Sequence, residues 1–357
     1  MTAPLPLVDL DDADALVAAD RDGVLRSAAT AGAQVRAVHS ALDEGVLARL
    51  SGVRPRSVVL VAGGDRAGRG ASLVATVASG ALGFPVLTAA CTPPWVGPLD
   101  VVIVAGDDAG DPALASSIDA AVRRRADTVV VAPDEGPVRE VAAGRALVLA
   151  PRVPALRRHT TAGHLAAFVA VLATLDPRWR GGTESLRALA DALDAEALTD
   201  GPAGEVFRNP AKTIVARLHG RRGLVTGGSP LALEIARTAS DAFVHAGAVV
   251  AAAPLSDVVA SARVLRGDTG VADSIFYDPE IDGPPPVDPV RVLAVATASD
   301  RDVTRRRVEL LGDAHVLTVA GDDADAAVAG ADELDEAALL VARFDMAAAY
   351  LELIGGR

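Results

Sequence analysis

Cysteine, lysine and aromatic residues are almost missing from this chain. Cys91 is the single cysteine in 357 residues, so an internal disulfide cannot form and a zinc site built from several thiolates is excluded. Aromatic residues make up 3% of the chain and hydrophobic residues 50%, so alanine, valine and leucine must fill a core of tightly packed helix and sheet layers. Lys212 is the single lysine, and the use of arginine elsewhere is typical of a GC-rich bacterial genome.

Surplus positive charge and long apolar runs are missing as well. The net charge of −13 and the pI of about 4.9 argue against nucleic acid and anionic membrane surfaces as partners. No apolar stretch reaches the ~18–20 residues that span a bilayer, and the N-terminus lacks the basic region and apolar run of a signal peptide. We therefore expect a cytoplasmic protein that does not act at a membrane.

The histidines show no metal-ligand spacing such as H-E-x-x-H, so we expect no metal site and no cofactor. Their positions are His39, His159, His164, His219, His245 and His315.

Two stretches of the chain share one order of elements. Residues 57–90 and 222–254 each run from a short apolar segment into a Gly-Gly pair, then a long alanine-rich helix, then a second apolar segment. Continuous apolar runs bounded by glycine are typical of strands buried on both faces. Strands and helices alternate after each stretch, so we predict an α/β protein with two parallel-sheet domains and flanking helices.

The predicted domain boundaries follow from this repeat. We expect two N-terminal helices in 1–55, a first sheet domain over 56–175, interdomain helices over 176–221 and a second sheet domain over 222–357. The second domain should end in an apolar helix over 334–355, and its acidic, proline-rich segment 267–289 is expected to be an exposed loop.

Each stretch carries a glycine turn between strand and helix, where free backbone N–H groups favour an anion. The turn Gly63–Gly70 lacks the Lys-Ser/Thr pair of a P-loop and the register of a dinucleotide fingerprint, and Asp65 adds a negative charge. A tight turn that needs small residues explains it without a ligand, and a nucleotide or NAD site is the weaker alternative. The turn Gly227-Gly228-Ser229 contains no acid, so helix capping by Ser229 and ligand binding both remain open.

Four stretches, in the same order along the chain, give it a family resemblance. The chain resembles the bifunctional phosphoglucose/phosphomannose isomerases of the SIS (sugar isomerase) superfamily, and among them degenerate actinobacterial relatives of the TobH type. The stretches that carry the resemblance are LDDADALVAADRDGVLRSAATAGAQV (10–35), NPAKTIVARLHGR (209–221), DRDVTRRRVEL (300–310) and RFDMAAAYLELIGG (343–356). The resemblance implies two SIS-type, flavodoxin-like domains, a sugar phosphate or related small metabolite as ligand, and a homodimer.

The sites of the family are altered in this chain. Its members bind phosphate through a Gly-Gly-Ser turn and an S-x-S-G-x-T loop, and here the turn ends in Asp65 while the loop, residues 105–110, carries Asp107 and Asp108. The expected glutamate base and ring-opening histidine fall near Ala242 and Val258, and the family's C-terminal lysine is missing.

The resemblance leaves candidate residues for both binding and catalysis. Candidate ligand-binding residues are Gly63, Gly64, Gly227, Gly228, Ser229, and Arg158 as the counterpart of a family arginine. Candidate catalytic residues are Asp241, His245 and His159, of which the first two lie close in sequence to the position expected for the base.

Two functions follow from these changes. The first is a SIS protein whose isomerase chemistry has decayed and which binds a metabolite in a regulatory role. The alternative is an active aldose–ketose isomerase with a rearranged site. Lys212 is predicted to be a structural residue that joins the two domains, pairs with a carboxylate or a helix end, and tolerates replacement by arginine.

Overall fold

A computed structural model describes residues 9–63, 65–266, 289–320 and 332–355. The chain divides into two compact units. One is a continuous stretch, Asp22–Leu198, which we call the continuous unit. The other combines Met1–Arg21 with Thr199–Arg357, and we call it the split unit.

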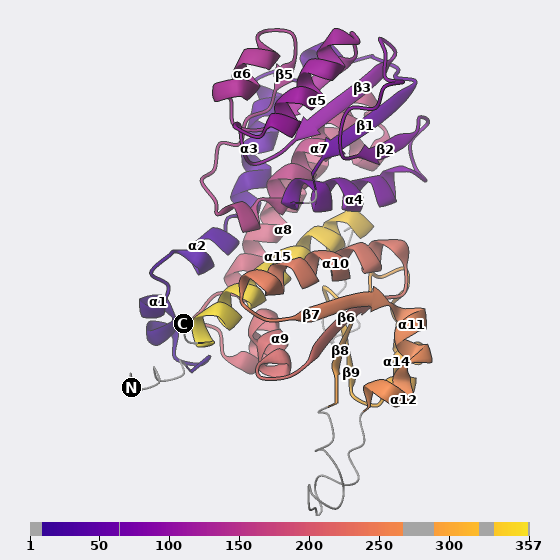
Figure 1. Ribbon diagram of the computed structural model, residues 1–357. Helices are drawn as coiled ribbons and strands as arrows, with labels where there is room; N and C mark the ends of the chain where they lie inside the picture. Colours follow the sequence, from indigo (N-terminus) through magenta and orange to yellow (C-terminus); the bar gives the residue numbers. More distant parts are fainter. Residues whose placement is uncertain (1–8, 64, 267–288, 321–331, 356–357) are drawn as a thin grey trace, which may run out of the picture. The chain divides into compact units, whose positions relative to one another are not determined.

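The continuous unit contains a five-stranded parallel sheet in the order β2-β1-β3-β4-β5 (Figure 1). Its strands are β1 (Ser57–Ala62), β2 (Val86–Ala89), β3 (Asp100–Ala105), β4 (Asp127–Val131) and β5 (Leu147–Val148). Every residue of β3 is buried, as are the first five of β1 and the last four of β4, because helices cover both faces of the sheet. This is the parallel sheet with buried strands that the apolar runs predict.

Helices α5 and α6 lie on one face of this sheet, and α4 and α7 on the other (Figure 1). The α-helices of the unit are α2 (Val24–Ala28), α3 (Ala31–Asp43), α4 (Arg66–Ala78), α5 (Pro112–Arg123), α6 (Gly136–Ala142), α7 (Thr161–Leu175) and α8 (Ser185–Thr199). Short 3-10 turns are η1 (Ala48–Leu50), η2 (Arg157–His159) and η3 (Trp179–Glu184).

The split unit contains a four-stranded parallel sheet in the order β7-β6-β8-β9. Its strands are β6 (Gly223–Gly227), β7 (Val250–Pro254), β8 (Arg291–Val295) and β9 (Ala314–Leu317). The two sheets confirm the predicted α/β fold of two parallel-sheet domains with flanking helices. The expected loop 267–289 lies, except for Pro289, outside the described residues.

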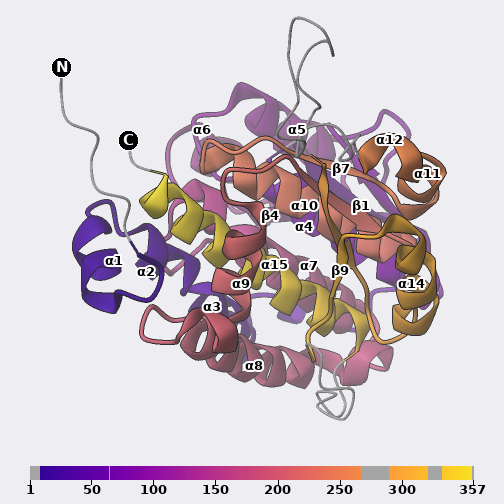
Figure 2. The same cartoon turned by 90° about the horizontal axis from the view of Figure 1, so that it is seen from below.

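One face of the second sheet is covered by α10, and α15 lies beside α10 in both views (Figures 1 and 2). The α-helices of the unit are α1 (Ala13–Ala19), α9 (Pro210–Leu218), α10 (Pro230–His245), α11 (Leu255–Ala260), α12 (Ala262–Leu265), α14 (Arg301–Val308) and α15 (Glu333–Ile354). Two 3-10 turns, η4 (Val206–Arg208) and η5 (Glu309–Leu311), complete the elements named here. The apolar C-terminal helix is thus confirmed as α15.

The start of the chain differs from the expectation of two helices. Three short helices, α1, α2 and α3, and the turn η1 precede β1. Gly23, with a φ of 67°, separates α1 from α2, because a left-handed residue ends helical hydrogen bonding. None of the described helices is long and apolar enough to cross a bilayer.

Candidate functional site

The first sheet reverses its strand order between β1 and β3. In sheets of this kind, ligands bind outside the carboxyl ends of the strands at the point of reversal. Here that point is formed by the turn after β1, which contains Gly63 and Asp65, and by the loop 106–110 after β3. The order supports a candidate site where the family resemblance puts the phosphate.

The turn after β1 is tight because α4 approaches the strand closely. A Cβ atom on Gly68 would lie 1.9 Å from the carbonyl oxygen of Gly63, so the helix can begin here only with glycine at that position. The Asp65 carboxylate accepts a hydrogen bond of 3.2 Å from the Ala67 N–H and caps α4. An acceptor of this chain therefore uses a helix N–H that would otherwise be available to an anion. Gly64 lies outside the described residues.

The loop after β3 places Asp107 against the start of α7. Its carboxylate accepts a hydrogen bond from Thr160 Oγ1 at 3.1 Å and lies 2.9 Å from His164 Nε2. The side chain of Asp107 is 11% exposed and that of His164 is 7% exposed. Asp107 thus bonds to one hydroxyl and one imidazole that could otherwise have donated hydrogen bonds to a bound anion.

The electrostatic surroundings keep Asp107 ionised. Burial alone would raise the pKa of this carboxyl group. The hydrogen bonds from His164 and Thr160 and the charges of His164 and Arg157 outweigh burial, so the pKa of Asp107 lies below its ordinary value. An ionised carboxylate accepts hydrogen bonds and donates none.

A hollow of about 60 Å³ separates the two loops, and most of its charged groups are acidic. Arg157, which lines it as well, is in an ion pair of 3.7 Å with Asp108. A carboxylate a few ångströms from a phosphate repels it strongly in a partly buried site. The acidic residues that line the hollow are Asp65, Asp107, Asp108 and Asp111.

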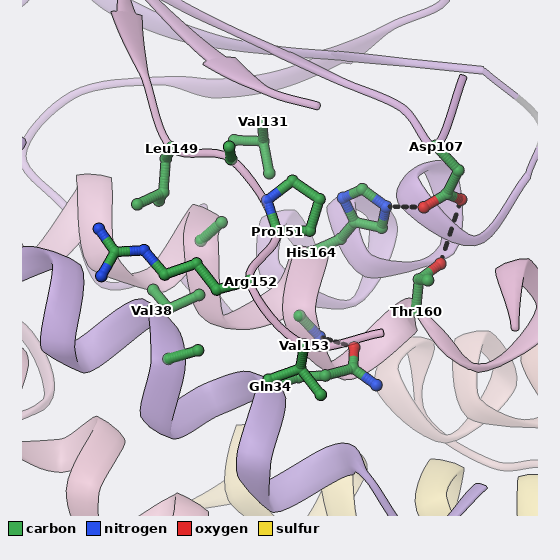
Figure 3. A pocket seen from close by; sticks show the side chains of 14 residues that line it. Gln34, Val38, Asp107, Val131, Leu149, Pro151, Arg152, Val153, Thr160 and His164 are labelled. Carbon is green, nitrogen blue, oxygen red and sulfur yellow. Dashed lines mark hydrogen bonds and ion pairs between the residues drawn. The ribbon is translucent and has the colours of Figure 1, made fainter. Parts of the chain in front are cut away.

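A second cavity, of about 50 Å³, lies beside the Asp107–His164 pair (Figure 3). Apolar side chains form most of its wall, among them Val38, Val131 and Leu149. Gln34 closes one end of the cavity, where its side-chain Nε2 donates to Thr160 Oγ1 and to the carbonyl oxygen of His159, each at 2.9 Å. This cavity is mostly apolar with a polar end, a combination usual in small-molecule sites.

The other candidates in the continuous unit lie at the edge of this region. His159 is buried, and its Nδ1 lies 2.9 Å from Ser27 Oγ, which ties η2 to α2. That contact fits a structural role for His159 better than a catalytic one. Arg158 is half-buried in η2, while the neighbouring Arg157 faces the acidic hollow.

The second glycine turn follows β6, at the reversal of strand order in the split unit. Ser229 Oγ accepts from the Ala232 N–H at 3.1 Å, so Ser229 is the N-cap of α10. Although the turn itself contains no acid, a Cβ atom on Gly228 would lie 3.8 Å from Asp300 Oδ2. A carboxylate therefore faces this turn too, and capping explains Ser229.

Asp241 and His245 lie far from that turn. Both are near the C-terminal end of α10, and the 16 residues of this helix extend about 24 Å from its start beside Ser229. His245 lines a groove of about 680 Å³ together with His219, Arg221 and Arg222. The structure does not bring these catalytic candidates to the glycine turns of their own unit.

The positions expected for the family's base and ring-opening acid lie in the core. Ala242 is 3% exposed and Val258 is 2% exposed. Neither side chain can transfer a proton, and burial leaves no room beside them for a sugar.

Lys212 is held by the backbone. Its Nζ donates to the carbonyl oxygens of Pro202 and Gly204, each at 2.7 Å, and lies 5.5 Å from the centre of the Tyr350 ring. Burial lowers the pKa of this ammonium group, which the charges of Asp11 and Asp9 partly counteract.

The residues just before Lys212 form the start of α9. Asn209 caps α9 through the Lys212 N–H at 2.9 Å, and Pro210 occupies the first helical position. All these contacts lie within the split unit, so they give Lys212 a structural role there, with backbone carbonyls in place of the expected carboxylate or helix end, and not the expected role of joining the two domains.

Sequence reasoning missed His164 and Thr160. The sequence identifies Asp107 as a departure from the phosphate loop, but its partners lie 57 and 53 positions further along the chain. A search for hydrogen-bond donors near the start of the apolar helix that became α7 could have found them.

No protein-family model matches the chain, and no curated protein matches it either. Solved structures do match over nearly its full length. Tagatose-6-phosphate ketose/aldose isomerase from Escherichia coli is 15% identical, with a TM-score of 0.55 and coverage of 99% of this chain and 95% of that one. Glucosamine-6-phosphate deaminase from Thermotoga maritima is 13% identical, with a TM-score of 0.60 and coverage of 93% and 94%.

A glucose-6-phosphate isomerase-like protein from Thermus thermophilus is 18% identical, with a TM-score of 0.55 and coverage of 98% of this chain and 96% of that one. At such identities the likeness establishes the fold. The chain has the fold of SIS-domain phosphosugar isomerases, while the narrower relation to TobH-type proteins stays a prediction.

Proposed function

We propose that this chain uses the fold of phosphosugar isomerases to bind a small sugar-related metabolite in a regulatory role, without isomerising sugar phosphates. One observation carries the proposal. The Asp107 carboxylate stands at the carboxyl end of β3 and is bonded to Thr160 and His164. The chain's own anion thus takes hydrogen-bonding groups that a phosphate would need.

The core positions of Ala242 and Val258 support the same proposal. Removal of a general base costs about 10²–10⁴-fold in rate, and groups that act as a unit are lost together. A chain without the base and the ring-opening acid retains at most the orientation of its ligand.

The Asp107–His164 pair gives the alternative function its best support. An imidazole oriented by a carboxylate is a usual general base, so an isomerase with a rearranged site would use His164. Asp241 and His245 offer a weaker version of this alternative, because they lie at the end of α10 remote from Ser229.

The test is a coupled assay of fructose 6-phosphate conversion to glucose 6-phosphate and mannose 6-phosphate. We expect no turnover above background. Turnover of about one per second that His164→Gln abolishes would establish the rearranged isomerase. If Asp241→Ala or His245→Ala abolishes it, the base lies on α10. Residual turnover that all three variants retain indicates a contaminating host enzyme.

We also predict a homodimer, as in the family the chain resembles. The apolar residues of α15 are buried, and the helix packs against α9 and α10. Light scattering at micromolar concentration should give about twice the 36.2 kDa of one chain. A mass of one chain would exclude the dimer.

A further inference from the structure

The Asp107–His164 pair fixes the proton of the imidazole. Asp107 is ionised and can only accept, so the ring nitrogen 2.9 Å away, Nε2, must carry hydrogen. In the neutral ring the other nitrogen, Nδ1, then presents a lone pair. In that neutral form Nδ1 is a hydrogen-bond acceptor of defined direction, whereas both nitrogens of a protonated ring donate.

Nδ1 of His164 is buried and has no hydrogen-bond partner among the residues that the structure describes. In Figure 3 this nitrogen points away from Asp107 and toward Pro151, which lines the second cavity. A buried polar atom without a partner has lost its hydrogen bond to water without compensation, so such an atom calls for a water or a ligand.

The other polar groups at this end of the cavity already have partners. Gln34 Oε1 accepts from the Gly163 N–H at 3.2 Å, and Gln34 Nε2 donates to Thr160 Oγ1 and to the His159 carbonyl oxygen. Arg152 forms a bidentate ion pair with Glu44, in which Nη1 and Nη2 each lie 2.6 Å from a carboxylate oxygen. Among the described polar side chains that line the cavity, His164 therefore offers a ligand a buried atom without a partner, Nδ1.

Charge and size restrict the ligand further. An anion would be repelled by Asp107, and a cation would lose its hydration against the apolar wall. A single water needs roughly 10–15 Å³ of such space. The cavity of about 50 Å³ therefore has room for a group of several heavy atoms.

We infer that this cavity binds an uncharged molecule, or the uncharged end of a larger one, that presents a hydroxyl or N–H donor to His164 Nδ1 on a short apolar body. The inference rests on the proposed function in treating the site as a binding site. It adds the chemical class of the ligand and the residue that selects it.

Two solvents of four heavy atoms test this inference, because 2-propanol has a donor and acetone has none. We expect 2-propanol to shift the His164 Nδ1 resonance saturably in ¹⁵N-histidine-labelled protein. Acetone should bind at least about tenfold more weakly, since one hydrogen bond is worth about 1.4 kcal/mol. His159 is the internal control, because its Nδ1 already lies 2.9 Å from Ser27 Oγ.

A cavity-filling variant and a crystal soak complete the test. Val38 lines the cavity and is half-buried, so Val38→Phe should abolish the 2-propanol response and leave the melting temperature nearly unchanged. A soaked crystal should place the alcohol oxygen within hydrogen-bond distance of Nδ1. Equal binding of acetone, a response that survives in Val38→Phe, or ordered water alone in the soaked cavity would overturn the inference.

The outcome is separable from that of the proposed function. Turnover of fructose 6-phosphate would reject the binding-only function and leave the 2-propanol result to stand by itself. Absence of both turnover and 2-propanol binding would reject this inference and leave the proposed function intact.

Discussion

Replacement of both Asp65 and Asp107 by serine should raise the affinity for fructose 6-phosphate at least about tenfold. The double variant removes two negative charges from the hollow between the loops. It also releases Thr160 Oγ1 and His164 Nε2 from the Asp107 carboxylate, whereas serine at position 65 can still cap α4 through the Ala67 N–H. Two charges at about 4–6 Å from a phosphate, at an effective dielectric constant near 20, are worth several kcal/mol before screening, so tenfold is a lower bound.

Isothermal titration calorimetry at constant ionic strength measures this affinity. The matched control is Asp119→Ser with Asp191→Ser, which changes the net charge equally. Asp119 pairs with Arg123 on α5, and Asp191 pairs with Arg36, so both lie outside the hollow. An equal gain in the control would mean that net charge alone governs binding. No gain in either variant would mean that the carboxylates do not block an anion site.

Lys212→Met should destabilise the protein by about 2–3 kcal/mol. Methionine keeps the apolar stem but removes the ammonium group, which leaves the carbonyl oxygens of Pro202 and Gly204 without their charged donor. Contact with the Tyr350 ring is lost as well. Chemical denaturation followed by circular dichroism measures the loss, and Arg217→Met, at an exposed position of α9, should change stability by less than about 0.5 kcal/mol.

Lys212→Arg should also be destabilising, which differs from the expectation from sequence that arginine is tolerated. Lys212 is 0% exposed, and a planar guanidinium is larger than the ammonium group that fits between the two carbonyls. The expected loss is about 1–3 kcal/mol. A variant as stable as the parent protein would show that the site can expand.

The fold was accessible from sequence because its strands are continuous apolar runs. β1 and β3 can be recognised from Val58–Val61 and Val101–Val104, since a strand buried on both faces has no polar alternation. The weak strand β5 has two residues, and its pairing with β4 depends on tertiary contacts that no local pattern encodes.

The candidate site was only partly accessible, for a physical reason. Asp107 could be recognised as an acid where a hydroxyl was expected, but its effect depends on His164, and α7 is apolar almost all round, so His164 resembles an ordinary core residue. The same limit applies to Gly228, whose neighbour Asp300 comes from a loop after another strand. Both sites therefore depend on contacts between residues that are far apart in the sequence.

The division of the split unit has a consequence for the order of events during synthesis. The continuous unit emerges from the ribosome as one uninterrupted stretch and can fold while the rest of the chain is still being made. The first helix of the chain has no such opportunity, because α1 packs against α15 and Asp11 Oδ1 accepts from the Val206 N–H at 2.8 Å. Helix α1 must therefore wait for nearly the whole polypeptide, and a nascent chain halted before residue 333 should leave residues 9–21 open to proteases although the continuous unit is already resistant.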